Sequence, residues 1–300
     1  ASRKKRCSRD SMEIRVSVVL PVYNQAHYLP AALEGVFAQI YRDYELILVD
    51  DGSTDSTAEV LAEYAERHRF EILTQENQGL ARALNAGFAR ARGAYLTWTS
   101  SDNIMLPEML EELAQALDGD PSVGLVYADR YLMDERGVDL GLYPAPEYDP
   151  YLLLHANLVH CCFLYRRECM ERVGGYDPEF VYSEDWEYWI RISQYYRMKR
   201  VPQALYRYRY HGTSMTSELI RGTSRNMKYV DFAGHIRRRM PVRWYVGKLK
   251  WWWLRLAVRD HPLMTERAAV RSLTVRASGV EDQRVAEHDC NGIAAHGPAE

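Results

Sequence analysis

The sequence predicts an α/β fold with a doubly wound, mostly parallel sheet that is flanked by helices and followed by a C-terminal helical extension. Patterns typical of buried strands alternate with patterns typical of helices through residues 16–128. Hydrophobic residues make up 47% of the 300 residues, which is enough for a sizeable core. Because the crossover between neighbouring strands is right-handed, strands separated by single helices are expected to run parallel.

Apolar runs mark the predicted strands, which cover residues 16–20, 45–50, 70–74, 95–99 and 124–128. The segments between them carry apolar side chains at every third or fourth position, as Leu110, Leu113 and Leu117 do. Ser56 and Glu59 have the spacing of a capping box, which predicts that a helix begins next to them. Strand and helix therefore alternate without interruption through the first part of the chain.

The composition argues against several classes of protein. The net charge of −3 is unfavourable for a bulk nucleic-acid binder, and no apolar run approaches the roughly 20 residues needed to span a bilayer. Residues 1–13 are basic and polar, and they are expected to be a tail without a signal peptide. The five cysteines form no CxxC pair, which argues against a structural zinc site and predicts reduced thiols in a cytoplasmic protein.

Polar residues follow the predicted strands at one edge of the sheet, where ligands of doubly wound sheets bind. These carboxyl ends are residues 21–24, 50–55 and 100–103. Two adjacent carboxylates there, Asp50 and Asp51, are costly unless they have partners. Helix capping would account for Ser53 but not for the adjacent Asp50 and Asp51. One of these two carboxylates can accept the N–H of a uracil or the hydroxyls of a ribose. Asp102 can bind a hard divalent cation, although such a residue alone is more often a turn residue or an N-cap.

Several motifs occur in a fixed order along the chain. They are VSVVLPVYN (16–24), ELILVDDGSTDST (45–57), NQGLARALNAGFARARGAYLTW (77–98) with the SSDN after it, VGGYDPEF (173–180) and EDWEYWIRI (184–192). Together they resemble the inverting family 2 glycosyltransferases of the GT-A fold, the last two resembling that family's acceptor-side segment. The resemblance covers residues 14–215, and the order and spacing of the motifs make it specific.

The resemblance implies roles for residues of the nucleotide pocket. Tyr23 would stack on a uracil, Asp51 would accept its N–H, and Arg82 would face the diphosphate. With the polar residues of the same loops, the expected nucleotide-binding set is Pro21, Tyr23, Asn24, Asp50, Asp51, Ser53, Arg82 and Ser101.

The resemblance also implies a divalent metal, Mn²⁺ or Mg²⁺. Asp102 matches the last acid of the metal-binding DxD motif, and His211 matches a late histidine that approaches the metal or the diphosphate. The sequence departs from the pattern at Ser100, which occupies the first acidic position, and Ser101 is not acidic either. A single motif carboxylate therefore remains, and weaker metal binding is expected.

Asp185 matches the catalytic base of the family, with Glu184 as the second choice. A carboxylate within hydrogen-bond reach can take the proton of an acceptor hydroxyl, while a metal and cationic donors stabilise the leaving diphosphate. Trp186, Trp189 and Ile190 predict a buried face on this helix, which would hold Asp185 in place. The alternative is that the two acids only favour the positive end of the helix dipole.

The expected domain organisation follows the limits of the resemblance. It comprises the tail 1–13, a catalytic domain at 14–215 with a nucleotide-binding half (14–129) and an acceptor-side half (130–215), a helical extension at 216–260, and a loose tail at 261–300. Within the extension, residues 241–256 combine tryptophan with basic residues. That combination suits a helix at a membrane interface, or equally one that packs on the catalytic domain.

The expected function is an inverting transfer of a sugar from a nucleotide-diphospho-sugar, most commonly a UDP-sugar, to a hydroxyl of a saccharide or lipid-linked acceptor in polysaccharide or glycan synthesis. The expected location is the cytoplasm, with peripheral contact at the inner face of the membrane through 241–256, and no nucleic-acid partner is expected. A nucleotidyltransferase would carry a glycine-rich loop after the first strand, whereas PVYNQAHYL (21–29) has no glycine. A catalytically weakened module that only binds nucleotide-sugars stays open as an alternative.

Overall fold

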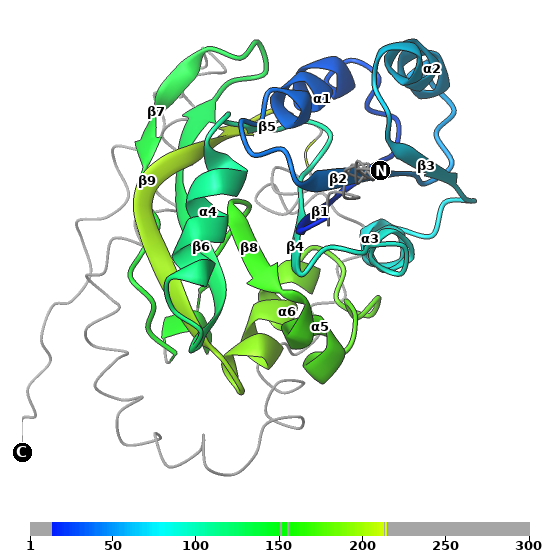
Figure 1. The fold of residues 1–300 in the computed structure, drawn as a ribbon. Helices are drawn as coiled ribbons and strands as arrows, with labels where there is room; N and C mark the ends of the chain where they lie inside the picture. Colours follow the sequence, from blue (N-terminus) through cyan, green and yellow to red (C-terminus); the bar gives the residue numbers. More distant parts are fainter. Residues whose placement is uncertain (1–13, 151, 155, 213, 215–300) are drawn as a thin grey trace, which may run out of the picture. The chain divides into compact units, whose positions relative to one another are not determined.

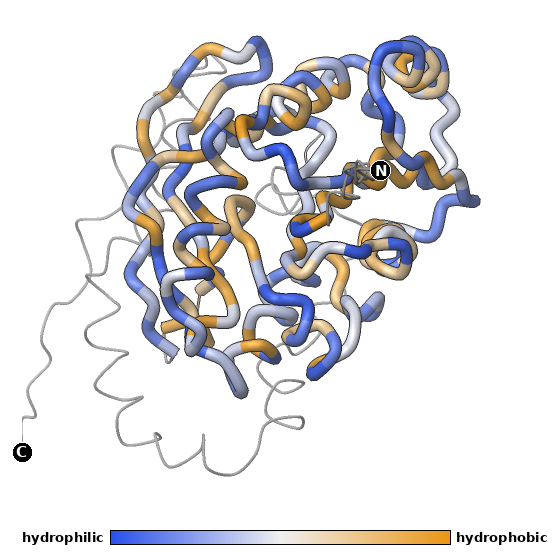
Figure 2. The backbone as a smooth tube through the Cα atoms, in the orientation of Figure 1, coloured by the Kyte–Doolittle hydropathy of each residue, from blue (hydrophilic) through white to orange (hydrophobic). Residues whose placement is uncertain are grey.

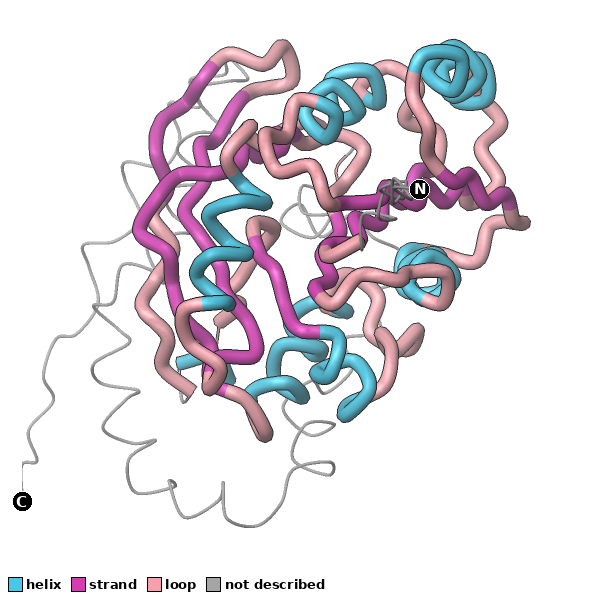
Figure 3. The backbone as a smooth tube through the Cα atoms, viewed as in Figure 1, coloured by secondary structure: helices cyan, strands magenta, loops and turns pink. Residues whose placement is uncertain are grey.

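The structure is a computed structural model, and it describes residues 14–150, 152–154, 156–212 and 214. These residues all belong to the first of two units of the chain, residues 1–238. The described strands form a nine-stranded sheet in the order β3-β2-β1-β4-β8-β6-β9-β5, with β7 paired to β6. Figure 1 shows this sheet as a ribbon, and Figure 3 shows the helices that flank it.

The first half of the sheet is parallel, as the alternation of elements predicts. Its strands are β1 (Val16–Val22), β2 (Tyr44–Asp50), β3 (Glu71–Thr74) and β4 (Tyr95–Trp98), and its helices are α1 (Leu29–Phe37), α2 (Thr57–Arg67) and α3 (Leu80–Phe88). β1 pairs in parallel with β2 on one side and with β4 on the other, and β2 pairs in parallel with β3. The carboxyl ends of these strands therefore meet at one edge of the sheet.

The second half of the sheet mixes parallel and antiparallel pairs. Its elements are β5 (Ile104–Met105), α4 (Met109–Asp118), β6 (Val123–Met133), β7 (Asp139–Tyr143), the 3-10 helix η1 (Leu152–Leu154), β8 (Phe163–Arg166), α5 (Arg167–Val173), α6 (Glu184–Ser193) and β9 (Arg197–Arg209). β8 lies between β4 and β6 and is antiparallel to both. β6 therefore has the same direction as β4, as expected for strands joined by one helix, although the two are not neighbours.

The sheet is buried on both faces in its centre. All seven residues of β1 are buried, and Figure 2 shows the apolar character of the strands near it. One face packs against α1, α2 and α4 in a hydrophobic cluster that includes Val18, Leu33 and Leu113. The other face packs closely against α3, where a Cβ on Gly87 would lie 2.5 Å from the Val19 side chain. Figure 1 shows α1 and α2 on one side of β1–β3 and α3 on the other.

The start of α2 differs from the sequence-based expectation. The Ser56 side chain makes no capping hydrogen bond, so the predicted box with Glu59 does not form. Asp55 takes over this function, since its Oδ1 accepts the Thr57 N–H at 3.0 Å. Its Oδ2 accepts the N–H of Ala26 at 3.0 Å, which joins the start of α2 to the loop after β1.

The predicted C-terminal extension and tail lie outside the described residues, and their assignments stay predictions.

Candidate active site

Asn24 joins the loop after β1 to the loop after β2. Its backbone N–H donates to Ser53 Oγ at 3.0 Å, and its Oδ1 accepts the N–H of Thr54 at 2.7 Å. Asn24 has a φ of +51°, a left-handed conformation that asparagine tolerates better than most residues. Asp50 Oδ1 accepts the N–H of Ser53 at 3.0 Å and so shapes the turn after β2. These bonds fix a loop in which Tyr23 remains 47% exposed and has surface free for stacking.

Asp51 is only 3% exposed, and it holds the loop between β3 and α3. Its Oδ1 accepts Gln75 Nε2 at 2.7 Å and the N–H of Gln78 at 2.9 Å, and its Oδ2 accepts the N–H of Gly79 at 2.8 Å. A carboxylate has about four acceptor positions, so these donors leave one free on Oδ2. Asp51 therefore holds this loop in place and can still accept one further N–H.

The remaining predicted nucleotide contacts lie around these loops. Pro21 is buried in β1, Ser101 is 6% exposed after β4, and Arg82 is exposed in the first turn of α3. Because α3 begins directly after Gly79, the loop that Asp51 holds also positions Arg82. The loops meet at one sheet edge as expected, and the contacts of these residues with a nucleotide stay predictions.

Asp102 and His211 meet at the same edge of the sheet. The distance between Asp102 Oδ2 and His211 Nε2 is 2.9 Å, and the side chains are 18% and 1% exposed. Asp102 Oδ1 is buried and has no hydrogen-bond partner in the described part of the chain. A buried carboxylate oxygen without a donor is costly, and a hard divalent cation would satisfy it.

The donor set fits a metal that relies on its substrate for ligands. The described residues contain no group of three or more His, Cys, Asp or Glu that could hold a metal ion by itself. Mg²⁺ and Mn²⁺ accept sites with one or two carboxylates, with diphosphate oxygens and water completing the shell. Asp102 supplies one such oxygen, with His211 beside it, whereas Ser100 and Ser101 supply no carboxylate.

Arg209 supports the Asp102–His211 pair from β9. Its Nε donates to the carbonyl oxygen of Asp102 at 2.9 Å, and its backbone N–H donates to Asn103 Oδ1 at 2.8 Å. Its guanidinium lies 4.9 Å from the ring centroid of Tyr28, whose ring lies 4.7 Å from that of His211. A cavity of about 510 Å³ adjoins this support and is lined by His27, Tyr28, Ala31, Glu135, Arg136 and Arg209.

Glu184 and Asp185 form the first turn of α6, on the acceptor side of the predicted site. Glu184 is buried, whereas Asp185 keeps part of its surface accessible. Asp185 Oδ1 accepts the N–H of Trp186 at 2.6 Å, and its Oδ2 accepts Asn157 Nδ2 at 2.8 Å. Burial raises the pKa of both carboxyl groups, and the nearby Asp185 charge adds to the increase for Glu184. A raised pKa suits a general base that works near neutral pH.

The Cys161 thiol is affected by the charges of both the predicted metal ligand, Asp102, and the predicted base, Asp185. Burial raises the pKa of its thiol to about 12, and the charges of Asp185 and Asp102 both contribute to the increase. One side chain therefore lies within electrostatic range of both the predicted metal ligand and the predicted base.

Sequence reasoning missed three residues that shape the site, namely Gln75, Asn157 and Arg209. Gln75 and Asn157 bind carboxylates that lie 24 and 28 positions away in the chain, and neither belongs to a recognised motif. Arg209 lies in the YRYRYH segment that also contains His211, so its closeness to the site could have been anticipated.

In the part of the chain that the structure describes, no helix has the length and apolar character of a membrane span.

Comparison with known proteins identifies related sequences. The family model described as glycosyl transferase family 2 matches residues 17–174. The O-antigen biosynthesis protein RfbC of Myxococcus xanthus is 33% identical over 60% of this chain and 14% of its own length. An uncharacterized glycosyltransferase of Rickettsia prowazekii is 27% identical over 67% of this chain and 66% of its own length. The chain thus spans less than two thirds of the length of each of these curated relatives.

Solved structures share the fold at low sequence identity. The mannosyltransferase PcManGT from Pyrobaculum calidifontis, solved with GDP-Man and Mn²⁺, aligns with a TM-score of 0.60 at 21% identity and covers 89% of this chain and 81% of its own. S. aureus TarS in complex with UDP-GlcNAc aligns with a TM-score of 0.56 at 20% identity and covers 68% of this chain and 60% of its own. These likenesses show that the fold is that of GT-A glycosyltransferases.

Proposed function

The chain belongs to glycosyl transferase family 2, and on that basis we propose that it transfers a sugar from a nucleotide-diphospho-sugar to an acceptor hydroxyl with inversion at the anomeric carbon. The observation that carries the proposal is the contrast between the surroundings of two carboxylates, Asp102 and Asp185. Asp102 has a buried oxygen without a donor in the described part of the chain, and Asp185 has a raised pKa and a partly accessible surface. The environment of Asp102 suits a metal ligand near the leaving diphosphate, and that of Asp185 suits a general base.

The donor binds at the edge formed by the loops after β1, β2 and β4. The exposed ring of Tyr23 stacks on the base, and the free acceptor position on Asp51 Oδ2 takes the base N–H. The rigid loop that Asp51 holds keeps the pocket from rearranging, which lowers the cost of ordering it on binding. Arg82, exposed at the start of α3, contributes a cation for the diphosphate.

Asp102 would hold the divalent cation through its buried Oδ1, with His211 beside the metal. When bound, Mn²⁺ or Mg²⁺ supplies positive charge to the diphosphate as the bond to the sugar breaks. The 2.9 Å contact between the two side chains fixes the carboxylate, and Arg209 fixes the backbone beneath it through the carbonyl of Asp102. This fixed arrangement avoids reorganisation during the reaction.

Asp185 acts as the base in a single displacement. The acceptor oxygen attacks the anomeric carbon from the face opposite the diphosphate, and the bond between that carbon and the diphosphate oxygen breaks. Asp185 takes the proton of the acceptor hydroxyl as its oxygen forms the new bond. Glu184 is buried beside it, and burial together with the Asp185 charge raises the pKa of the Glu184 carboxyl.

The donor classes follow from the solved relatives. TarS is solved with UDP-GlcNAc and PcManGT with GDP-Man, so UDP-sugars are the first candidates here and GDP-sugars the second. The acceptor proposed is a saccharide or a lipid-linked saccharide in polysaccharide synthesis, in keeping with the O-antigen relative. The competing proposal is a module that binds nucleotide-sugars without turnover, and the serines at 100 and 101 favour it.

The two proposals differ in turnover. Release of UDP or GDP from a panel of nucleotide-sugars with Mn²⁺, first with water and then with oligosaccharides as acceptor, is expected to be measurable for the wild type. Asp185→Asn is expected to lose at least 100-fold of that rate while binding the nucleotide as tightly as the wild type. Glu171→Gln, which removes an exposed acid from α5, serves as the control with an unchanged rate. Nucleotide binding without turnover by the wild type would favour the binding module.

A further inference from the structure

Asn157 joins the loop between η1 and β8 to the first turn of α6. Its Nδ2 donates to Asp185 Oδ2 at 2.8 Å, and its Oδ1 accepts the N–H of His160 at 3.1 Å. The second bond settles which end of the carboxamide faces the carboxylate, because only the oxygen can accept from a backbone N–H. The amide donor of Asn157 must therefore face Asp185.

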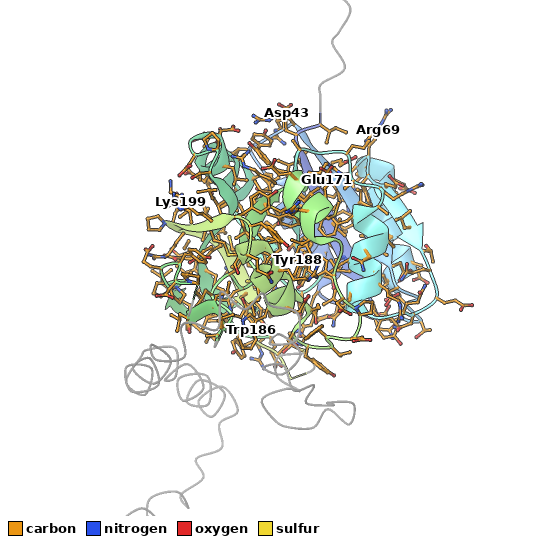
Figure 4. All side chains as sticks on the ribbon, turned by 90° about the horizontal axis from the view of Figure 1, so that it is seen from below. Asp43, Arg69, Glu171, Trp186, Tyr188 and Lys199 are labelled. Carbon is orange, nitrogen blue, oxygen red and sulfur yellow. The ribbon has the colours of Figure 1, made fainter. Side chains whose placement is uncertain are left out.

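The loop that carries Asn157 is itself fixed on both sides. Trp186, which follows Asp185 on α6, donates its indole N–H to the carbonyl oxygen of Leu153 at 2.6 Å. Figure 4 shows Trp186 near the edge of the described fold, with Tyr188 farther in on the same helix. His160 has a φ of +55°, a left-handed conformation that is uncommon outside glycine and that turns the chain back after Asn157. These anchors hold the carboxamide at one place relative to α6.

We propose that Asn157 is a positioning residue for Asp185, holding its carboxylate in one rotamer and favouring its ionised form. The inference rests on the proposed function for the statement that Asp185 is the base. Among the described residues, Asn157 donates to Oδ2 of Asp185 and the backbone N–H of Trp186 donates to Oδ1. The donor on Oδ1 belongs to the helix backbone, so Asn157 is the side chain that orients the group.

The groups that face Asp185 make the inference measurable. Glu184 lies on the same helix, Cys161 lies on the loop after Asn157, and Tyr176 lies before α6, and each of them interacts with the Asp185 charge. Burial raises the pKa of Cys161 to about 12 and that of Tyr176 well above its usual value, so both stay neutral between pH 4 and about 9. Of these three neighbours, only Glu184 can titrate in the range where Asp185 titrates.

Direct titration of Asp185 by carbon NMR tests the proposal. The full chain is labelled with carbon-13 at the aspartate carboxyl carbon, and the Asp185 signal is assigned by its loss in Asp185→Asn. All variants carry Glu184→Gln as a common background, so that titration of Glu184 does not overlap with that of Asp185. Asn157→Asp keeps an oxygen for the His160 N–H but removes the donor to Asp185. The titration midpoint of Asp185 is expected to rise by about 1–2 pH units in this variant.

Two further variants complete the test. Asn157→Ala also removes the donor, and it is expected to raise the midpoint in the same direction without adding a charge. Gln194→Ala removes a carboxamide from the other end of α6 and is expected to leave the midpoint unchanged. A midpoint that stays within about 0.3 units of the wild type in both Asn157 variants would overturn the proposal.

The outcomes separate this inference from the proposed function. If Asp185→Asn abolishes turnover while the Asn157 variants leave the Asp185 midpoint unchanged, the base assignment stands and the role of Asn157 is refuted. If the midpoint shifts as expected but Asp185→Asn turns over the donor at the wild-type rate, Asn157 holds a carboxylate that is not the base.

Discussion

Asp51→Asn tests whether this carboxylate builds the donor pocket. In the wild type, Oδ1 accepts from Gln75 and Gln78, and Oδ2 accepts from Gly79. The amide oxygen of an asparagine can occupy the Oδ1 position and keep two of these bonds. Its NH₂ group then meets the N–H of Gly79, so that two donors face each other in a buried place.

The expected loss of stability follows from these bonds. A hydrogen bond to a charged group contributes about 1.5–3 kcal/mol, and a bond between neutral groups contributes about 0.5–1.5 kcal/mol. One bond of the first kind is lost and two weaken to the second kind, while the neutral amide is easier to bury than a carboxylate. The free energy of unfolding is therefore expected to fall by about 2–4 kcal/mol.

Urea denaturation followed by fluorescence measures this change. With a denaturant slope of about 3 kcal/mol per M, the unfolding midpoint of Asp51→Asn is expected to fall by about 1 M. Glu76→Gln removes the same charge from the same loop, but its side chain is exposed, and its midpoint is expected to match the wild type. Equal midpoints for Asp51→Asn and the wild type would refute the reasoning that this carboxylate carries the loop.

Two other substitutions test the acceptor side. Glu184→Gln is expected to raise the melting temperature at pH 7.5 but not at pH 4. Burial raises the pKa of the Glu184 carboxyl, so at neutral pH the unfolded state binds fewer protons than the folded state, and the stability of the wild type falls as the pH rises. An equal change in melting temperature at both pH values would contradict this reasoning. Gly175→Ala is expected to lower the free energy of unfolding by about 1–3 kcal/mol, because its Cβ would clash with Asn85 Oδ1, which accepts the Tyr176 N–H. Unchanged stability in thermal unfolding would show that the Asn85 side chain moves aside without cost.

The fold of the first half could be predicted because its elements are local. The run from Val16 to Leu20 is apolar except for Ser17, whose hydroxyl donates to Glu45, and a strand buried on both faces needs such a pattern. The place of β8 could not be predicted, since its antiparallel entry between β4 and β6 depends on contacts between segments far apart in the chain. The two-residue strand β5 was missed for a similar reason, because only its pairing with β9 defines it.

The candidate site divides in the same way. Asp51, Asp102 and Asp185 could be selected because each lies in a motif at a strand or helix end. Their partners could not, since the bonds from Gln75 and Asn157 depend on how loops meet in space. The polar chemistry of the site is thus visible in the sequence, whereas the residues that orient it appear only in the structure.

Calorimetric binding of UDP with and without Mn²⁺ is the most direct test of the central claim that Asp102 anchors a metal-assisted nucleotide site. The buried Oδ1 of Asp102 predicts micromolar binding that depends on Mn²⁺ and that is lost in Asp102→Ala. GDP and dTDP are measured in the same way, so that a different base preference is not mistaken for an empty site. Binding of the preferred nucleotide that is equally tight without metal, or unchanged in Asp102→Ala, would contradict the claim.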